Sequence, residues 1–248
     1  MIFDFIGTLV SVRNYDMEAS TRKLYKAIFD AGFKVDEKDF LKAYGEAHEK
    51  YRIVRYEELV EVTNAVWVSE ALNSLGFKTS TEDTCLKSAI NVFFADYLES
   101  LKLNPCAKEL LSEASSACKT GLISNFTYAP VIYAAVRRLG IGHCFNAVLV
   151  SEDVGVRKPN RKIFDEALRR LRVNAEETVY VGDSPLEDMK GAAVVGMKTI
   201  FVPSQFYSLG NLQESGQKPD LIVKDLCELY KKLKDKRSLS VQELFLDS

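Results

Sequence analysis

The sequence predicts an α/β fold: a doubly wound, three-layer parallel sheet interrupted by one all-helical insert. Short apolar runs alternate with helix-length segments from about residue 102 onward, which indicates parallel strands joined by right-handed crossovers. Another such run occupies residues 1–6. Residues 16–101 carry helical patterns only, so they interrupt a domain that the first strand has already begun.

Composition limits the classes of partner. The 248 residues are 47% hydrophobic and 27% charged, enough for one large or two unequal domains. A net charge of -2 argues against nucleic acid or an anionic membrane surface, and no apolar run is long enough to cross a bilayer. We therefore expect a cytoplasmic monomer or homodimer. The cysteines are scattered without a CxxC pair and are interpreted as buried free thiols in a reducing compartment: Cys85, Cys106, Cys118, Cys144 and Cys227.

The insert is expected to contain four helices, over residues 16–31, 36–51, 55–75 and 86–101. Asp16 and Asp36 are suited to the N-terminal turns of the first two, and Gly32 and Gly76 stop the first and third. Trp67 and His48 also lie at helical spacing, and we interpret them as packing or surface residues rather than ligands.

Beyond the insert, strands are predicted at 120–125, 147–150, 178–181, 198–202 and 220–223. Helices are predicted at 105–117, 131–139, 162–171, 186–195 and 226–233. The resulting division has an α/β core domain over 1–12 and 102–233, a helical domain over 13–101 and a C-terminal tail over 234–248.

Polar residues follow several of these strands. Asp4 ends the first strand, Ser124 ends another, Lys158 follows a third, and Asp183 and Asp188 flank the end of a fourth. Each alone fits a turn or a helix cap. In a parallel sheet, however, the carboxyl ends of the strands share one edge, where ligands bind, so we expect the five side chains to converge.

Four segments at these strand ends carry a family resemblance. They are FDFIGTL at 3–9, LISN at 122–125, the lysine of GVRKP at 155–159, and GDSPLED at 182–188. In this order they resemble the four motifs of the haloacid dehalogenase (HAD) superfamily, over essentially the whole chain up to about residue 233. The resemblance implies a hydrolase with a Rossmann-like core, a mobile helical cap formed by the insert, and a Mg²⁺ cofactor.

The resemblance also implies residue roles, with Asp4 as nucleophile. A carboxylate that attacks phosphorus forms an aspartyl-phosphate, and Mg²⁺ and a lysine ammonium would neutralise the repulsion between the two anions. Thr8 is expected to support the turn rather than react. The resemblance implies that Asp4, Ser124 and Lys158 are catalytic. It implies that the phosphate is bound by Ser124, Asn125, Lys158, Gly7 and Thr8. The metal is expected to be bound by Asp4, Asp183, Asp188 and a backbone carbonyl near Ile6.

Ile6 departs from the family pattern. Related phosphatases have a second Asp there, which protonates the leaving oxygen and then activates water, and such a group contributes roughly 10²–10⁴-fold in rate. Three outcomes are open. In the first, the cap or the substrate supplies the proton in place of the missing Asp, and Tyr15, Arg55 and Tyr56 are the candidates in the cap. In the second, the substrate has a leaving group that needs no proton, such as an acyl phosphate or a halide. In the third outcome, the protein binds phosphate compounds and hydrolyses very little.

The favoured function is Mg²⁺-dependent phosphoryl transfer from a small phosphorylated substrate through an aspartyl-phosphate on Asp4. The alternative is 2-haloacid dehalogenation with the same nucleophile, because halide departure needs no acid. That chemistry has no use for a metal, yet the sequence keeps Asp183 and Asp188. A weakly active protein that binds phosphate compounds is the second alternative. No pattern in the insert identifies the substrate.

Overall fold

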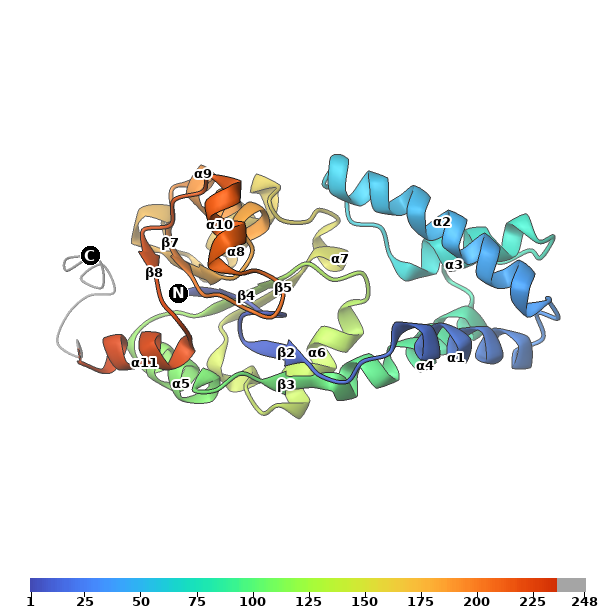
Figure 1. Ribbon diagram of the computed structural model, residues 1–248, viewed down its shortest axis with the longest axis horizontal. Coiled ribbons are helices and arrows are strands. Elements are labelled where there is room, and N and C mark those ends of the chain that lie inside the picture. The colour runs from blue at the N-terminus through green and yellow to red at the C-terminus, as the bar shows by residue number, and fades with distance from the viewer. Residues whose placement is uncertain (236–248) are drawn as a thin grey trace.

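A computed structural model describes residues 1–235 of the chain and shows six parallel strands in one sheet (Figure 1). The spatial order is β5-β4-β1-β6-β7-β8, with β1 inside the sheet. The predicted doubly wound α/β class is thereby confirmed. The strands are β1 Ile2–Asp4, β4 Gly121–Ser124, β5 Ala147–Val150, β6 Val179–Gly182, β7 Lys198–Phe201 and β8 Leu221–Ile222.

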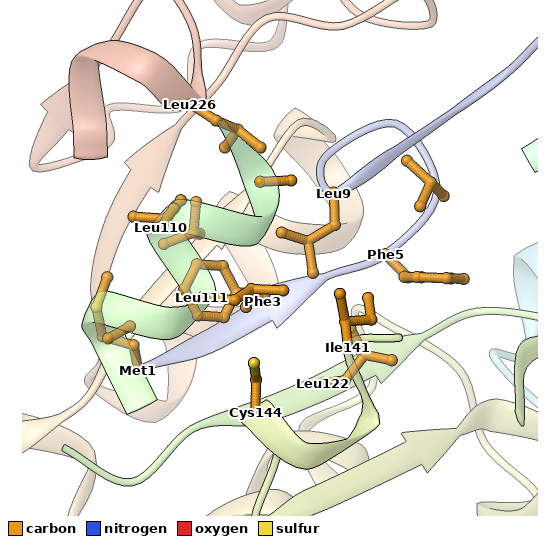
Figure 2. Packing of buried hydrophobic residues seen from close by; sticks show 14 of the residues in the cluster. Met1, Phe3, Phe5, Leu9, Leu110, Leu111, Leu122, Ile141, Cys144 and Leu226 are labelled. Carbon is orange, nitrogen blue, oxygen red and sulfur yellow. The ribbon is translucent and has the colours of Figure 1, made fainter. Parts of the chain in front are cut away.

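Helices cover both faces of this sheet because successive strand residues point to opposite sides. Phe3 and Leu122 belong to one buried cluster with α5, α6 and α11, whereas Ile2 and Ile123 belong to a second cluster with α8 and α9. Figure 2 shows the first cluster, in which Phe3 of β1 meets leucines of α5. The helices around the sheet are α5 Ala107–Ala117, α6 Ala129–Arg138, α7 Ser151–Val154, α8 Arg161–Leu171, α9 Lys190–Val195, α10 Leu209–Ser215 and α11 Leu226–Asp235, with single 3₁₀ turns at Gly142–Cys144 and Ala175–Glu177.

The helical insert, residues 13–101, lies at one end of the molecule and has a buried cluster largely of its own (Figure 1). Its helices are α1 Met17–Asp30, α2 Glu37–Glu57, α3 Asn64–Ser74 and α4 Thr84–Ser100. Asp16, Asp36 and Asp83 accept backbone N–H groups at the starts of α1, α2 and α4, as helix caps do. Trp67 is buried in this cluster.

The predicted single helix over 55–75 is wrong, because residues 58–63 interrupt it. Residues 55–57 end α2, and the chain between α2 and α3 is not helical. This linker pairs instead with the loop before α8: Glu61 N–H donates to the Gly155 carbonyl at 3.1 Å, and Arg157 N–H donates to the Leu59 carbonyl at 3.1 Å. Backbone pairing with a distant segment has replaced helix formation in this linker. The local sequence pattern carries no information about that pairing partner.

The two covalent connections between the insert and the sheet domain pair with each other. β2 Val10–Val12 and β3 Leu101–Leu103 form an antiparallel ribbon with Ser11 opposite Lys102, visible between the two parts of the molecule in Figure 1. The sequence did not predict this ribbon. Gln205 extends it, since its side-chain amide accepts from Val12 N–H at 2.9 Å and donates to the Val12 carbonyl at 3.1 Å.

The prediction of five buried free thiols is wrong. Cys106 and Cys227 form a disulfide across 121 residues of sequence, and Cys85 is exposed. The two bonded residues lie at the starts of α5 and α11, which pack together beside the sheet, a proximity that their spacing in the sequence hides. The argument for a reducing compartment is therefore lost, and the cytoplasmic location stays a prediction.

Other differences are local. The predicted helix over 186–195 begins as a π-helical turn, Pro185–Met189, before α9, and the sequence did not predict α7 or α10. Within residues 1–235, no helix is long and apolar enough to span a bilayer. The predicted tail spans residues 234–248. Its first two residues end α11, and the rest lie outside the described residues.

Candidate active site

Asp4 ends β1 at the position where the sheet changes direction. From β1 the chain order runs to β4 and β5 on one side and to β6, β7 and β8 on the other. Ligands of open α/β sheets bind in the crevice beyond such a strand end. The Asp4 side chain is only about 8% exposed, so its charge depends on the groups described next.

The chain turns sharply after Asp4. The Phe5 carbonyl accepts from the N–H groups of Leu9 and Val10, and Gly7 N–H donates to the Val10 carbonyl at 2.7 Å. Gly7 has φ +104°, and a Cβ there would lie 2.2 Å from Asp183 Oδ2. Only glycine fits both the backbone and the neighbouring carboxylate.

A side chain from the ribbon fixes this turn from outside. Asn104, directly after β3, donates from Nδ2 to the carbonyls of Gly7 at 3.1 Å and Thr8 at 2.8 Å. The turn that follows Asp4 is therefore tied to one of the two connections to the insert. Asn104 was not predicted, because an isolated Asn before a proline reads as an ordinary turn residue.

Lys158 lies at the centre of the site with its side chain 1% exposed. Its Nζ is 2.7 Å from Asp4 Oδ1, 2.6 Å from Asp188 Oδ1 and 3.0 Å from the Tyr180 hydroxyl. Asn125 holds its backbone, accepting from Lys158 N–H at 2.8 Å and donating to the Lys158 carbonyl at 3.0 Å. The Asn125 side chain is thus committed to Lys158 and to Glu187 Oε2.

Asp188 is turned inward by the π-helical turn. Its Oδ2 accepts from the N–H groups of Asp183 and Ser184 at 3.1 and 2.9 Å, while Oδ1 binds Lys158 and the Tyr180 hydroxyl. Gly182 allows this approach, because a Cβ there would lie 2.5 Å from Asp188 Cγ. Insertions of π-helix often occur at functional sites.

Asp183 and Ser124 complete the site. Asp183 accepts from Thr8 Oγ1 at 3.3 Å and from Ser204 Oγ at 2.5 Å. Ser124 is buried at the end of β4, which pairs with β1 so that Ile123 lies opposite Asp4. All five residues predicted at strand ends therefore lie in one region, whereas Tyr180 and Ser204 were missed.

Three buried carboxylates share one ammonium in this region. Burial raises the pKa of Asp4 to about 6, and Lys158 opposes that rise. Burial also raises the pKa of Asp183, with further repulsion from Asp4 and Asp188. Burial lowers the pKa of Lys158, but Asp188 and Asp4 raise it more, so the ammonium stays charged. The site has an excess of negative charge.

Comparison with known proteins decides the family. The haloacid dehalogenase-like hydrolase family matches residues 1–196. The chain belongs to this family. The predicted hydrolase class is thereby confirmed.

Similar proteins in the HAD family include phosphatases and dehalogenases. A glyceraldehyde 3-phosphate phosphatase from Methanopyrus kandleri is 41% identical over 99 residues, which is 39% of this chain and 42% of that protein. Another, from Methanocaldococcus jannaschii, is 24% identical over 94% of this chain and 97% of its own. The solved 2-haloacid dehalogenase of Pseudomonas syringae pv. Tomato DC3000 shares the fold, with TM-score 0.63 and 22% identity over 95% of this chain and 97% of its own.

The residues of this HAD site fit a magnesium ion. Asp4, Asp183 and Asp188 each bring one oxygen to within 4.8 Å of the others. Asp4 Oδ2 is buried without a hydrogen-bond partner among the described residues, and the hydrogen bonds of the turn use the carbonyls of Phe5 and Val10 rather than that of Ile6. Carboxylate and carbonyl oxygens are the ligands that Mg²⁺ prefers.

Three residues suggested as proton donors are engaged elsewhere. Tyr15 donates to Met17 Sδ, and Arg55 Nε is 2.7 Å from Glu61 Oε1. Tyr56 lies under the Arg157 guanidinium at 4.4 Å. None of the three forms a hydrogen bond with Asp4 within residues 1–235. Ile6 itself is half-buried against the cluster of Figure 2.

Proposed function

We propose that this HAD hydrolase is a Mg²⁺-dependent phosphatase that acts on a small phosphorylated substrate through an aspartyl-phosphate on Asp4. The observation that carries the proposal is the buried set of three carboxylates with one orphan oxygen, Asp4 Oδ2, at the switch point of the sheet. A dehalogenase has no use for such a set. The phosphatase names of the similar proteins from two archaea support the same choice.

The proposed reaction has two displacements. Asp4 attacks phosphorus, the bond between phosphorus and the ester oxygen breaks, and the leaving oxygen takes a proton. Water then attacks the phosphorus of the aspartyl-phosphate, which releases inorganic phosphate and restores Asp4. Lys158 orients Asp4 by holding Oδ1.

Other residues of the chain position and neutralise charge. The Ser124 hydroxyl and neighbouring backbone N–H groups bind phosphate oxygens, and Asn125 holds the Lys158 backbone in place. Asp4, Asp183 and the Ile6 carbonyl would hold the metal, and Asp188 would add charge and orient Lys158. When bound, Mg²⁺ supplies positive charge against the phosphoryl oxygens and the nucleophile.

We also propose that the helical insert, residues 13–101, is a cap domain on a core of residues 1–12 and 102–233. Its separate buried cluster and its covalent attachment through the ribbon β2–β3 support this division. The substrate's leaving group would lie between the two domains, because Asn125 and Phe126, which directly follow β4, line a cavity together with residues of the insert.

Ile6 keeps one alternative open. A halide leaves without a proton, so the isoleucine is compatible with hydrolysis of a 2-haloacid through an ester on Asp4. Against it stands the protonation of Asp4. Burial raises the pKa of Asp4 to about 6, and the Asp188 charge adds to this rise although Lys158 opposes it, so less carboxylate is available for a metal-free displacement.

One experiment separates the three functions. Phosphate release from a panel of phosphate esters and acyl phosphates is measured with Mg²⁺ and with EDTA, and halide release from 2-chloropropionate is measured in parallel. Phosphate release that EDTA and Asp4→Asn both abolish supports the phosphatase. Halide release that persists in EDTA would support the dehalogenase instead of the phosphatase. If neither phosphate nor halide is released, the remaining function is a protein that only binds phosphate compounds.

A further inference from the structure

A cavity of about 350 Å³ lies between the helical insert and the loop after β4. Its wall is mostly aromatic and includes Tyr15, Trp67, Phe94, Tyr97 and Phe126. The volume is at the lower end of the range for small-molecule sites. None of these rings has a role in the mechanism proposed above.

The cavity adjoins the catalytic residues. Asn125 and Phe126 in its wall directly follow Ser124, and Asn125 also bonds the backbone of Lys158. Tyr97 packs on Phe126, with ring centroids 5.3 Å apart. A leaving group attached to a phosphate at Asp4 would therefore extend into this space.

The wall offers no free charge to a substrate. Its only arginine or lysine is Arg55, whose Nε is 2.7 Å from the fully buried Glu61 carboxylate. His48 is mainly neutral at pH 7, because burial and the neighbouring Arg55 lower its pKa. No Asp or Glu is in the wall. A carboxylate or a second phosphate would lose its hydration here without gaining an uncommitted cationic partner.

The rings are arranged to receive a flat group. Tyr97 and Phe126 stack with centroids 5.3 Å apart, and Phe94 meets Phe126 at 5.4 Å. The wall thus offers aromatic faces and edges, which prefer another ring.

We propose that the leaving group of the substrate is an uncharged aromatic alcohol, so that the substrate is an arylalkyl phosphate monoester. This inference rests on the proposed phosphatase function and adds the chemical class of the leaving group. It predicts a preference for a ring over a compact polar chain such as that of glyceraldehyde 3-phosphate.

The first test compares esters whose leaving groups are all primary alcohols, so that bond breaking is matched. They are benzyl, cyclohexylmethyl, ethyl and 4-carboxybenzyl phosphate, assayed with Mg²⁺. We expect kcat/KM for benzyl phosphate to exceed that for the cyclohexyl ester by about 3- to 10-fold, the range of one or two aromatic contacts, and to exceed the carboxylated ester by more. Equal values, or a preference for the ethyl or carboxylated ester, would overturn the proposal.

Two variants localise the effect. Phe126→Leu and Phe94→Leu remove rings from the wall, whereas Phe33→Leu removes a ring of the insert that packs on Phe77 and does not line the cavity. We expect the first two to raise KM for benzyl phosphate about 10-fold, with less effect on the cyclohexyl ester and on kcat. A loss equal for both esters, or equal in Phe33→Leu, would contradict a ring-binding site.

A binding measurement separates this inference from the proposed function. Trp67 is the only tryptophan of the chain and lies in the cavity wall, so its fluorescence reports directly on occupancy. Saturable quenching by benzylphosphonate, tighter than by cyclohexylmethylphosphonate, would support the site even if no ester is hydrolysed. Hydrolysis without a preference for a ring would support the phosphatase function and contradict the cavity as the leaving-group site. Absence of any fluorescence change would also contradict the cavity as the leaving-group site.

Discussion

The two oxygens of Asp4 have different surroundings, and this asymmetry leads to the first prediction. Oδ1 is bound by Lys158 at 2.7 Å, whereas Oδ2 is buried without a partner. Asp4→Asn keeps the shape but cannot form the acyl phosphate, so we expect phosphate release to fall by more than about 10³-fold with the circular dichroism spectrum unchanged. Asp165→Asn, on the exposed face of α8, is the control. Near-normal turnover by folded Asp4→Asn would exclude a covalent mechanism.

Ile6 lies two residues after Asp4, the proposed nucleophile, and its side chain has no proton to donate. Ile6→Asp should raise the rate of hydrolysis of an alkyl phosphate by at most about 10²–10⁴-fold. The rate for an aryl phosphate should rise less, because the leaving oxygen of an aryl ester needs little protonation. Ile6→Asn is the matched control, since it is as polar and nearly as large but transfers no proton. The measurement is steady-state phosphate release with Mg²⁺. Equal rates for the Asp and Asn variants would show that proton transfer does not limit turnover.

At the scale of elements, the turn after β1 depends on one glycine. Gly7→Ala should destabilise the fold and weaken Mg²⁺ binding, because the new methyl group would occupy the space of Asp183. Gly32→Ala is a matched control: its φ is +109°, but no atom lies within 4 Å of the added Cβ. Both variants should lose about 1–2 kcal/mol from the left-handed backbone, and Gly7→Ala more.

The readouts for this pair are urea unfolding and Mg²⁺ titration by calorimetry. The extra loss in Gly7→Ala measures the contact with Asp183 alone. Should the two variants lose equal stability and bind Mg²⁺ equally well, the close approach between turn and carboxylate would not exist in solution.

The linker between α2 and α3 joins the helical insert to the sheet domain through a buried carboxylate. Glu61 lies 2.7 Å from Arg55 Nε, 3.7 Å from Arg157 Nη1 and 2.5 Å from Ser151 Oγ. Removing one partner of a buried ion pair costs about 3–5 kcal/mol. We expect Glu61→Gln to increase hydrogen exchange in residues 58–61 and 155–157.

Glu70→Gln provides the comparison, because Glu70 pairs with Lys50 at the surface of the insert and exposed pairs contribute about 1 kcal/mol or less. Hydrogen exchange followed by mass spectrometry reads both variants. Unchanged protection of residues 58–61 in Glu61→Gln would mean that backbone pairing alone holds the linker.

Elements built from local patterns could be predicted from the sequence, and contacts between distant segments could not. The strand ends that present Asp4, Ser124 and Asp183 follow from apolar runs broken by turn residues. Tyr180 in contrast reads as one more apolar strand residue, and only the fold brings its hydroxyl to Lys158. The linker after α2 and the ribbon β2–β3 are likewise set by pairing partners about 90 residues away in the chain.

At the scale of the whole molecule, the disulfide between Cys106 and Cys227 ties α11 to the start of α5. Closing so long a loop restricts the unfolded chain and stabilises by about 4 kcal/mol. We expect the double variant Cys106→Ser, Cys227→Ser to lose about that much in urea unfolding, and Cys85→Ser, at an exposed position, to lose almost nothing. Titration of the unfolded protein without reductant should find three thiols, and five would show that the bond does not form.

The ribbon β2–β3 determines how the insert could move. Two separate hinges would allow the insert to twist and slide as well as swing. Because Val10, Ser11 and Val12 pair in register with Leu103, Lys102 and Leu101, the two connections must bend together, and a two-stranded ribbon bends far more easily across its face than within its plane. The ribbon would therefore favour one direction of swing over the others. Since Asn104 at the end of that ribbon holds the Gly7 and Thr8 carbonyls, each swing would pull directly on the turn that carries Asp4.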